Sequence, residues 1–286
     1  MSTVFFRKIG IIGAGQMGSG IAQVCASFGH AISLVDIKRS QLDNAKDSIR
    51  QSASKLLEKG KISSSAKDNI ASLIVYTEDY ASLVESDLVI EAVDEKEDLK
   101  KRVLRQVEDV VSKDCVIASN TSSISITKLS SVLKLPQRGI GVHFMNPVPL
   151  MKLVEVIPGL QTHKETNDRI MGFVKAIARE PVSSKDYPGF IVNRILMPMI
   201  NEAFFALMEG LASPEEIDTG MKLGTNQPMG PLQLADFIGL DTCLAIMTVL
   251  HNGFGDSKYR PCPLLIQYVH AGRLGRKTKS GVYSYE

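Results

Sequence analysis

The chain has 286 residues, enough for one large domain or two ordinary ones, and we expect two. Thirty-three Lys and Arg residues against thirty-one Asp and Glu leave a formal net charge of +2 without a long basic block, so neither nucleic acid nor an anionic membrane is an expected partner. The four cysteines lie far apart and form no C-x-x-C pair, which favours a reducing compartment. No apolar run reaches the ~18–20 residues of a membrane span, and too few residues precede the first predicted strand for a signal peptide.

A glycine-rich turn follows the first predicted strand, Lys8–Ile12, and opens a small-residue helix, Ser19–Phe28. This is the G-x-G-x-x-G pattern in its strand–turn–helix context, which is typical of a dinucleotide pyrophosphate site. A second strand, Ala31–Val35, ends at Asp36, where a carboxylate binds the adenosine ribose hydroxyls and repels a 2′-phosphate. The pattern therefore predicts NAD rather than NADP. The residues of the turn are Gly13, Ala14, Gly15, Gln16, Met17 and Gly18.

The next segment, Ser40–Lys61, has the apolar periodicity of one long helix, with Ser63–Ser65 closing it as a polar connection. Its polar side is basic, which is usual for a solvated face. The alternative is a phosphate-binding patch for a large anionic substrate, in which Ser52 and Lys59 are the residues of interest.

Two further strands, Asp87–Val93 and Cys115–Ala118, continue the alternating β–α pattern of a parallel sheet. Ligands of such sheets bind beyond the carboxyl ends of the strands. The segment through Glu95, with Lys100 beyond it, and the run Ser119–Ser123 are therefore candidate site segments. Capping of the next helix is an alternative role for the hydroxyls of this run.

A predicted hairpin carries the candidate catalytic pair. Strands Ile140–Phe144 and Lys152–Ile157 flank a turn of Asn and Pro residues, and symmetric pairing about Pro149 places His143 opposite Glu155. Directly opposed side chains on an antiparallel pair have Cβ atoms about 4.5–5.5 Å apart, so an imidazole and a carboxylate would meet as an oriented general base. A surface His–Glu pair or a core histidine is the alternative.

Composition changes at Lys185–Gly189, after which the strand pattern stops and helices are expected. We therefore predict an α/β chain in which a Rossmann-type dinucleotide-binding domain, residues 1–186, precedes an all-helical domain, residues 187–286. Asn193, in the first turn of the first of these helices, is a candidate cleft residue or an ordinary helix-start asparagine. The remaining histidines have no partner at ligand spacing, so no metal is expected. The predicted helices are 190–208, 214–223, 231–237, 240–251 and 263–271.

Taken together, these motifs resemble the short-chain L-3-hydroxyacyl-CoA dehydrogenase family, including 3-hydroxybutyryl-CoA dehydrogenases. The segments run through the whole chain in matching order and spacing. They are Ile9–Gln23, Ser119–Ser123, Gly141–Ile157, Pro188–Leu196, Asn226–Asp241 and Gly272–Tyr285. Met145 departs from the family, in which many members carry a second aromatic residue there.

The resemblance implies reversible NAD-dependent oxidation of (S)-3-hydroxyacyl-CoA to 3-ketoacyl-CoA, expected to be short-chain, in fatty-acid β-oxidation or butanoate metabolism. It also implies a helical C-terminal domain that binds substrate and forms a homodimer. The implied catalytic residues are His143, Glu155, Ser122 and Asn193. The implied cofactor contacts are the glycine turn with Asp36, Glu95, Lys100, Ser122, Asn146 and Lys277, and the implied acyl-CoA contacts are Ser52, Lys59, Ser122 and Asn193.

Three alternative interpretations of these motifs remain. A dehydrogenase of free 3-hydroxy acids would share the plan but would more naturally use a lysine base, and a crystallin-like structural relative could lose the catalytic pair. A pure CoA- or nucleotide-binding module would not need His143 opposed to Glu155. No targeting signal is visible, so we expect the cytoplasm for a bacterial source and the mitochondrial or peroxisomal matrix for a eukaryotic one.

Overall fold

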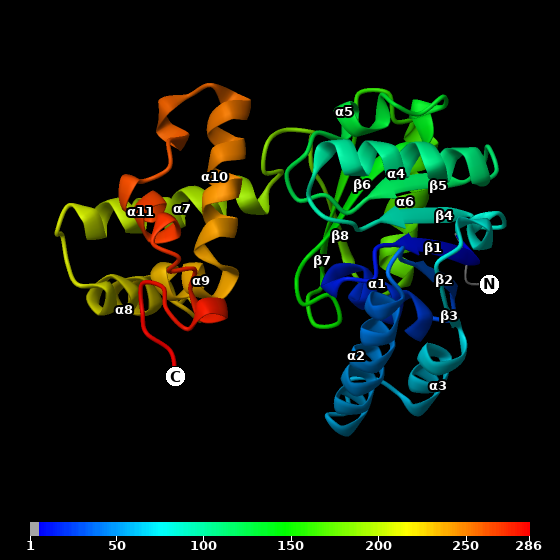
Figure 1. The fold of residues 1–286 in the computed structure, drawn as a ribbon, viewed down its shortest axis with the longest axis horizontal. Helices are drawn as coiled ribbons and strands as arrows, with labels where there is room; N and C mark the ends of the chain where they lie inside the picture. The colour runs from blue at the N-terminus through cyan, green and yellow to red at the C-terminus, as the bar shows by residue number, and fades with distance from the viewer. Residues whose placement is uncertain (1–5) are drawn as a thin grey trace. The chain divides into compact units, whose positions relative to one another are not determined.

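The computed structural model describes residues 6–286, and the chain divides into two compact units between Tyr187 and Pro188 (Figure 1). The first unit is built on one eight-stranded sheet with the order β3-β2-β1-β4-β5-β6-β7-β8. Every neighbouring pair is parallel except β6 and β7, which are antiparallel. The strands are β1 Lys8–Ile12, β2 Ala31–Val35, β3 Ile74–Thr77, β4 Leu88–Glu91, β5 Val116–Ser119, β6 Gly139–Phe144, β7 Leu153–Pro158 and β8 Glu180–Ser183.

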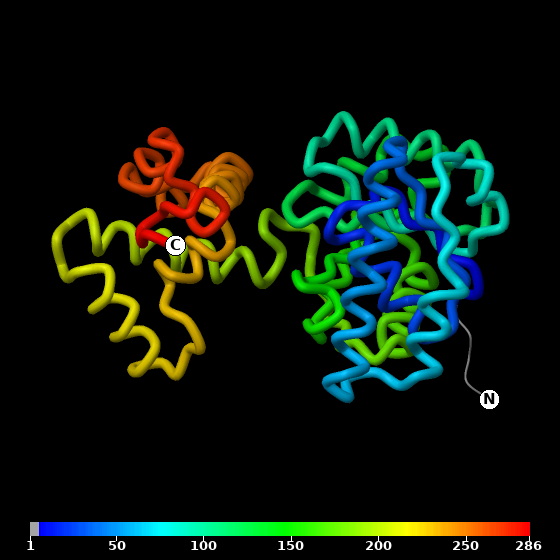
Figure 2. The backbone as a smooth tube through the Cα atoms, turned by 60° about the horizontal axis from the view of Figure 1, so that its bottom comes forward, coloured from blue at the N-terminus to red at the C-terminus, as the bar shows by residue number. Residues whose placement is uncertain are grey.

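Helices cover both faces of this sheet, because successive strand residues alternate between two apolar cores. In β4, Leu88 and Ile90 belong to the core under α1, α2, α3 and α6, whereas Val89 belongs to the core under α4 and α5. In Figures 1 and 2, α2 and α3 lie side by side. The helices of this unit are α1 Gln16–Ser27, α2 Arg39–Glu58, α3 Ser64–Ser72, α4 Glu97–Val110, α5 Ile126–Ser130 and α6 Lys164–Ala176, with short 3-10 helices at η1 Tyr80–Leu83 and η2 Pro136–Arg138.

One sequence expectation is wrong in this unit. The serine run at 63–65 does not close the long helix, which ends earlier at Glu58, before Gly60 at φ +61°. Instead the Ser63 hydroxyl accepts a hydrogen bond from the Ala66 N–H and caps a separate helix, α3. Serine is a strong N-cap residue, so the same polar run starts an element rather than ending one. The elements α3, β3, α6 and β8 were not predicted.

The second unit is helical and has its own core. Proline occupies the first position of three of its helices, α8, α9 and α11, where the missing N–H has no intrahelical partner to lose. The C-terminal segment is tied to these helices by buried carboxylates, since Asp236 accepts hydrogen bonds from the backbone N–H groups of Val282 and Tyr283. The elements are α7 Val192–Met208, α8 Pro214–Thr225, α9 Pro231–Ile238, α10 Leu240–Phe254, η3 Ser257–Tyr259, α11 Pro263–His270 and η4 Arg276–Thr278.

A membrane-spanning helix was not expected. Across residues 6–286, no single helix combines the length and apolar character needed to cross a membrane, although α9 and α10, bent by 99°, pass this criterion as a pair on length and composition alone.

Candidate active site

Apart from Ser52 and Lys59, the predicted site residues of the first unit gather at one edge of the sheet, where the parallel strands β1, β2, β4, β5 and β6 end. Side chains at this edge come from segments far apart in the sequence, because each parallel strand returns there through a crossover. The edge divides into a glycine loop after β1, a polar network after β4 and β5, and the hairpin of β6 and β7.

The glycine loop requires its three glycines for different reasons. Gly13 has φ +100°, and a Cβ there would lie 2.6 Å from the Ala92 carbonyl oxygen. A Cβ on Gly18 would lie 1.8 Å from the Gly13 oxygen, so this glycine permits close packing of α1 on the loop. Gly15, by contrast, has open space around its Cβ position and is the N-cap residue of α1, without a capping side chain. The open helix N-terminus behind it suits a phosphate.

Asp36 fixes this loop from the neighbouring strand. Its Oδ2 accepts a hydrogen bond from the Ala14 N–H at 2.8 Å and its Oδ1 accepts one from the Lys38 N–H at 2.9 Å. Beside these groups is a cavity of about 460 Å³ lined by apolar residues and by several polar ones, which suits an adenosine moiety. The cavity and the open Gly15 therefore fit a dinucleotide. The lining includes Gly13, Gly15, Asp36, Ile37, Val93 and Leu99.

The hairpin places its histidine and carboxylate as predicted. His143 of β6 pairs with Glu155 of β7 in the strand register, and His143 Nδ1 lies 2.7 Å from Glu155 Oε2. The Glu155 side chain is fully buried, and that of His143 is 10% exposed. Because a carboxylate accepts hydrogen bonds, Nδ1 carries the proton, and Nε2 is the nitrogen that can take up another one.

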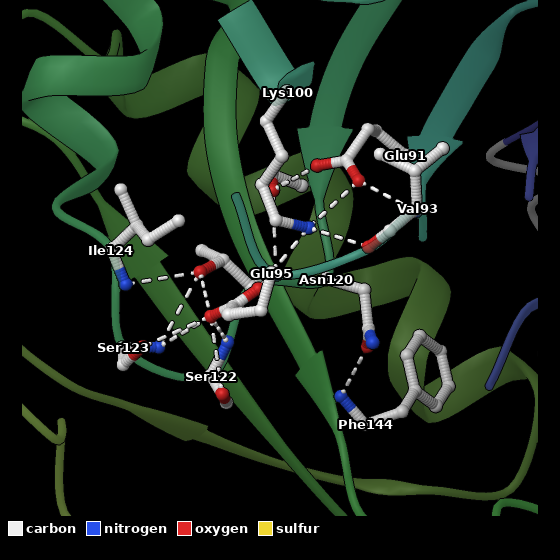
Figure 3. Close-up of polar contacts among 11 residues, drawn as sticks. Glu91, Val93, Glu95, Lys100, Asn120, Ser122, Ser123, Ile124 and Phe144 are labelled. Carbon is white, nitrogen blue, oxygen red and sulfur yellow. Dashed lines mark hydrogen bonds and ion pairs between the residues drawn. The ribbon is translucent and has the colours of Figure 1, made fainter. Parts of the chain in front are cut away.

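The loop after β5 is organised by one carboxylate oxygen (Figure 3). Glu95 Oε1 accepts hydrogen bonds from Thr121 Oγ1 at 2.6 Å, the Ser122 N–H at 2.8 Å and the Ser123 N–H at 3.1 Å. Burial by itself would raise the pKa of the Glu95 carboxyl, but the Lys100 ammonium and the bonds from Thr121 and Ser122 outweigh it and hold the pKa below its usual range. Capping is not the role of this run, because the N-cap of α5 is Ser125.

Lys100 lies behind Glu95 and is 1% exposed. Its Nζ is 2.8 Å from Glu91 Oε1 and 3.2 Å from Glu95 Oε2, and it donates to the Val93 carbonyl at 3.1 Å. These contacts use the donors of the ammonium group within the protein. Glu91, at the end of β4, is itself fully buried, and its Oε2 accepts a hydrogen bond from Ser119 Oγ at 2.6 Å.

Two residues of this edge, and a third one after β8, were missed by the sequence analysis as individual site residues. Glu91 ties β4 to β5, and Asn120 Oδ1 accepts a hydrogen bond from the Phe144 N–H at 2.9 Å, which ties β5 to β6. Asp186 follows β8, which runs antiparallel to β6 and ends at the opposite edge of the sheet. It accepts hydrogen bonds from Ser125 Oγ and the backbone N–H groups of Ile126 and Thr127, each at 2.8 Å. For Glu91 and Asn120 the available signal was a polar residue at the end of an apolar strand or directly after one.

The turn of the hairpin packs against α1, the helix that begins at the glycine loop. Val148 is buried, and a Cβ on Gly20 of α1 would lie 2.9 Å from the Val148 Cβ. Asn146, a predicted cofactor contact in this turn, is exposed.

The other predicted residues lie elsewhere. Ser52 is half-buried on α2, and Lys59 is exposed at the end of that helix; among residues 6–286, no hydrogen bond or ion pair joins either side chain to another predicted site residue. Asn193 is the second residue of α7 and is buried, and Lys277 of η4 pairs with Asp241. In the described part of the chain, no three or more His, Cys, Asp or Glu side chains are placed to hold a metal ion.

A parallel sheet with a glycine loop, an acidic residue after the next strand and a buried His–Glu pair at the same edge defines a nucleotide-dependent oxidoreductase. The family models for the NAD binding domain and the C-terminal domain of 3-hydroxyacyl-CoA dehydrogenase match residues 8–187 and 189–285. The chain belongs to the 3-hydroxyacyl-CoA dehydrogenase family. The predictions of the family, the fold class, the NAD cofactor and the oxidoreductase class are confirmed.

Relatives match over nearly the whole chain. A 3-hydroxybutyryl-CoA dehydrogenase of Bradyrhizobium diazoefficiens is 50% identical and covers 98% of this chain and 95% of its own length. The human mitochondrial hydroxyacyl-coenzyme A dehydrogenase is 40% identical, covering 99% of this chain and 92% of its own length. The crystal structure of (S)-3-hydroxybutyryl-CoA dehydrogenase from Ralstonia eutropha has a TM-score of 0.95 and 50% identity, covering 98% of this chain and 99% of the other.

Proposed function

We propose that the chain catalyses the reversible NAD-dependent oxidation of (S)-3-hydroxyacyl-CoA to 3-ketoacyl-CoA, with the 3-hydroxybutyryl-CoA and acetoacetyl-CoA pair as its short-chain substrates. The observation that carries the proposal is the buried His143–Glu155 pair at the sheet edge that also holds the glycine loop. Relatives at about 50% identity named for 3-hydroxybutyryl-CoA support the chain length. Fatty-acid β-oxidation or butanoate metabolism is the corresponding setting.

In this proposal His143 is the general base. Bound NAD supplies the hydride acceptor. His143 Nε2 removes the proton of the 3-hydroxyl group, while Glu155 keeps Nδ1 protonated and stabilises the imidazolium that forms. Ser122 and Asn193 bind the oxygen at C3. In the reverse direction such donors stabilise the developing alkoxide, by about 3–4 kcal/mol for a well-placed donor.

The remaining site residues are proposed as contacts of the two ligands. The glycine loop from Gly13 to Gly18 and Asp36 would hold the pyrophosphate and ribose, and Glu95, Lys100, Ser122, Asn146 and Lys277 would complete the cofactor site. For Lys100 we propose action through Glu95, because its donors are used within the protein. Ser52 and Lys59 would bind the acyl-CoA.

We propose residues 1–186 as the cofactor-binding part and residues 187–286 as the substrate-binding and dimer-forming part of a homodimer. The compartment would be reducing, namely the cytoplasm for a bacterial source or the mitochondrial or peroxisomal matrix for a eukaryotic one. A relative bearing a mitochondrial name and relatives from bacteria support both alternatives.

The test of the function is oxidation of NADH by acetoacetyl-CoA compared with free acetoacetate, followed in absorbance. We expect turnover with the CoA ester. Turnover with the free acid alone would indicate the alternative dehydrogenase of 3-hydroxy acids. Oxidation with neither substrate would indicate a structural relative of the crystallin type.

The role of the base is tested by His143→Gln. Loss of the general base lowers turnover by about 10²–10⁴-fold, whereas NADH binding measured by fluorescence should stay near that of the wild type. His163→Gln is the matched control, because His163 is an exposed residue at the start of α6. Near-normal turnover of His143→Gln would contradict the assignment.

A further inference from the structure

β6, the strand that carries His143, extends beyond the neighbouring strand β5. β5 ends at Ser119, which pairs with Gly141, and β6 continues through His143 to Phe144. Beyond Gly141, β6 therefore has no strand backbone of β5 beside it. The Phe144 N–H instead donates to the side chain of Asn120 at 2.9 Å (Figure 3). An amide side chain thus continues the ladder for one more step, next to His143.

Asn120 is well fixed for this role. It is 8% exposed, and its own backbone N–H donates to the Glu91 carbonyl at 2.8 Å. The residue before it, Ser119, is bonded to the buried Glu91 carboxylate at 2.6 Å. A backbone N–H can only donate, so the oxygen of the Asn120 amide must face Phe144. Both ends of this bond are consequently held by the sheet.

We propose that Asn120 is a positioning residue for His143. Its side-chain oxygen holds the end of β6 and thereby fixes the imidazole against Glu155 and toward the substrate. This inference rests on the proposed function, in which His143 is the base. Geometry matters here because a misplacement of about 1 Å in an active site can lower turnover by about 100-fold. Substrate and cofactor binding depend on other residues, so the effect belongs in kcat rather than in KM.

Two variants of similar size separate the effect of the hydrogen-bond acceptor from the effect of side-chain volume. Asn120→Leu keeps the size and removes the acceptor, whereas Asn120→Asp keeps an oxygen for the Phe144 N–H. The matched control is Thr162→Val, which removes a hydrogen bond to the Gly139 carbonyl at the opposite end of β6. Each variant is compared with the wild type in kcat and KM with acetoacetyl-CoA and NADH, NADH affinity, and hydrogen exchange at the Phe144 amide.

We expect Asn120→Leu to lower kcat by about 10–100-fold with KM and NADH affinity within about threefold of the wild type. Exchange at Phe144 should be faster in this variant. Asn120→Asp should recover kcat to within about fivefold and restore slow exchange, and Thr162→Val should keep kcat.

Three outcomes would overturn the proposal. The first is an unchanged kcat in Asn120→Leu. The second is an equal loss of kcat in Asn120→Leu and Asn120→Asp although Asn120→Asp keeps slow hydrogen exchange at the Phe144 amide. The third is a loss of kcat in Thr162→Val that equals the loss in Asn120→Leu. Each of these applies to an active wild type. An inactive wild type contradicts the proposed function itself, so the two failures are distinguishable.

Discussion

The loop after β1 and the loops after β4 and β5 lie at the same edge of the sheet and are shaped differently. In the first, positions without side chains decide the geometry, because a Cβ at Gly13 or Gly18 would overlap backbone atoms. In the second, polar side chains bond to one another, and the buried Lys100 lies between the carboxylates of the buried Glu91 and the exposed Glu95. The first, the nucleotide half, thus leaves room for its ligand, whereas the second, the polar-network half, is filled by its own polar groups.

The two halves should therefore differ in their sensitivity to substitution. A buried ion pair with one partner removed leaves an uncompensated charge, which is far more unfavourable than the loss of an exposed pair. In a glycine loop the same small substitution has different effects at different positions, because one glycine faces protein and another faces the ligand. Substitutions in each half can test this contrast.

The largest effect is expected in the polar network. Lys100→Met leaves the fully buried Glu91 carboxylate without its ammonium partner, and the free energy of unfolding should fall by about 3–5 kcal/mol. Urea unfolding at neutral pH measures it. The matched control is Lys101→Met on the same helix, whose ion pair with Glu97 is partly exposed and should contribute at most about 1 kcal/mol.

A double variant sharpens this prediction. Glu91→Gln together with Lys100→Met removes both charges, so it should be more stable than Lys100→Met alone. If the free energy of unfolding of Lys100→Met lies within about 1 kcal/mol of the wild-type value, the network is not the buried ion cluster described above.

A smaller effect on stability is expected in the glycine loop, and it should differ between Gly13 and Gly15. Gly13→Ala forces an L side chain to φ +100° and should lower stability by about 1–3 kcal/mol. Gly15 has φ −69°, which any residue adopts, so Gly15→Ala should change stability little while raising the Kd for NADH by about tenfold. Thermal unfolding and fluorescence titration measure the two quantities. Wild-type NADH affinity in Gly15→Ala would show that this face does not meet the cofactor.

The smallest effect concerns pH. The pKa of Glu95 is lowered in the fold, so its ionised form stabilises the protein above the ordinary value of 4.5, and this contribution is lost as the pH falls through the lowered value. The stability difference between the wild type and Glu95→Gln should therefore be constant near neutral pH and shrink below about pH 4.5. Urea unfolding measured from about pH 3 to about pH 7 covers this window. A difference that grows on acidification would contradict the lowered pKa.

Local patterns were sufficient for the nucleotide half. The bounds of β1 and β2 agree with the predicted strands residue for residue, because each is a short apolar run bounded by turn residues. The register of His143 with Glu155 also followed from the turn, since pairing in a hairpin is fixed by its symmetry. The NAD preference rested on Asp36 at the end of β2.

The polar network could not be predicted in the same way. Glu91 meets Ser119 across 28 positions of sequence, and Asn120 meets Phe144 across 24. Such pairs exist only once the strand order of the sheet is known, and one sequence does not fix that order. The missed helix α3 has a different cause, since its serine cap stood at the end of a longer helical pattern and was assigned to that pattern.

Gly20 connects the nucleotide half with the hairpin of β6 and β7. Because this position of α1 has no side chain, the turn after His143 lies directly against the helix that begins at the glycine loop. The absence of one methyl group thus sets the spacing between α1 and the hairpin that carries His143. Under the proposed function, that spacing is part of the distance between the hydride acceptor and the proton acceptor, and it is determined at a residue for which no ligand contact is proposed.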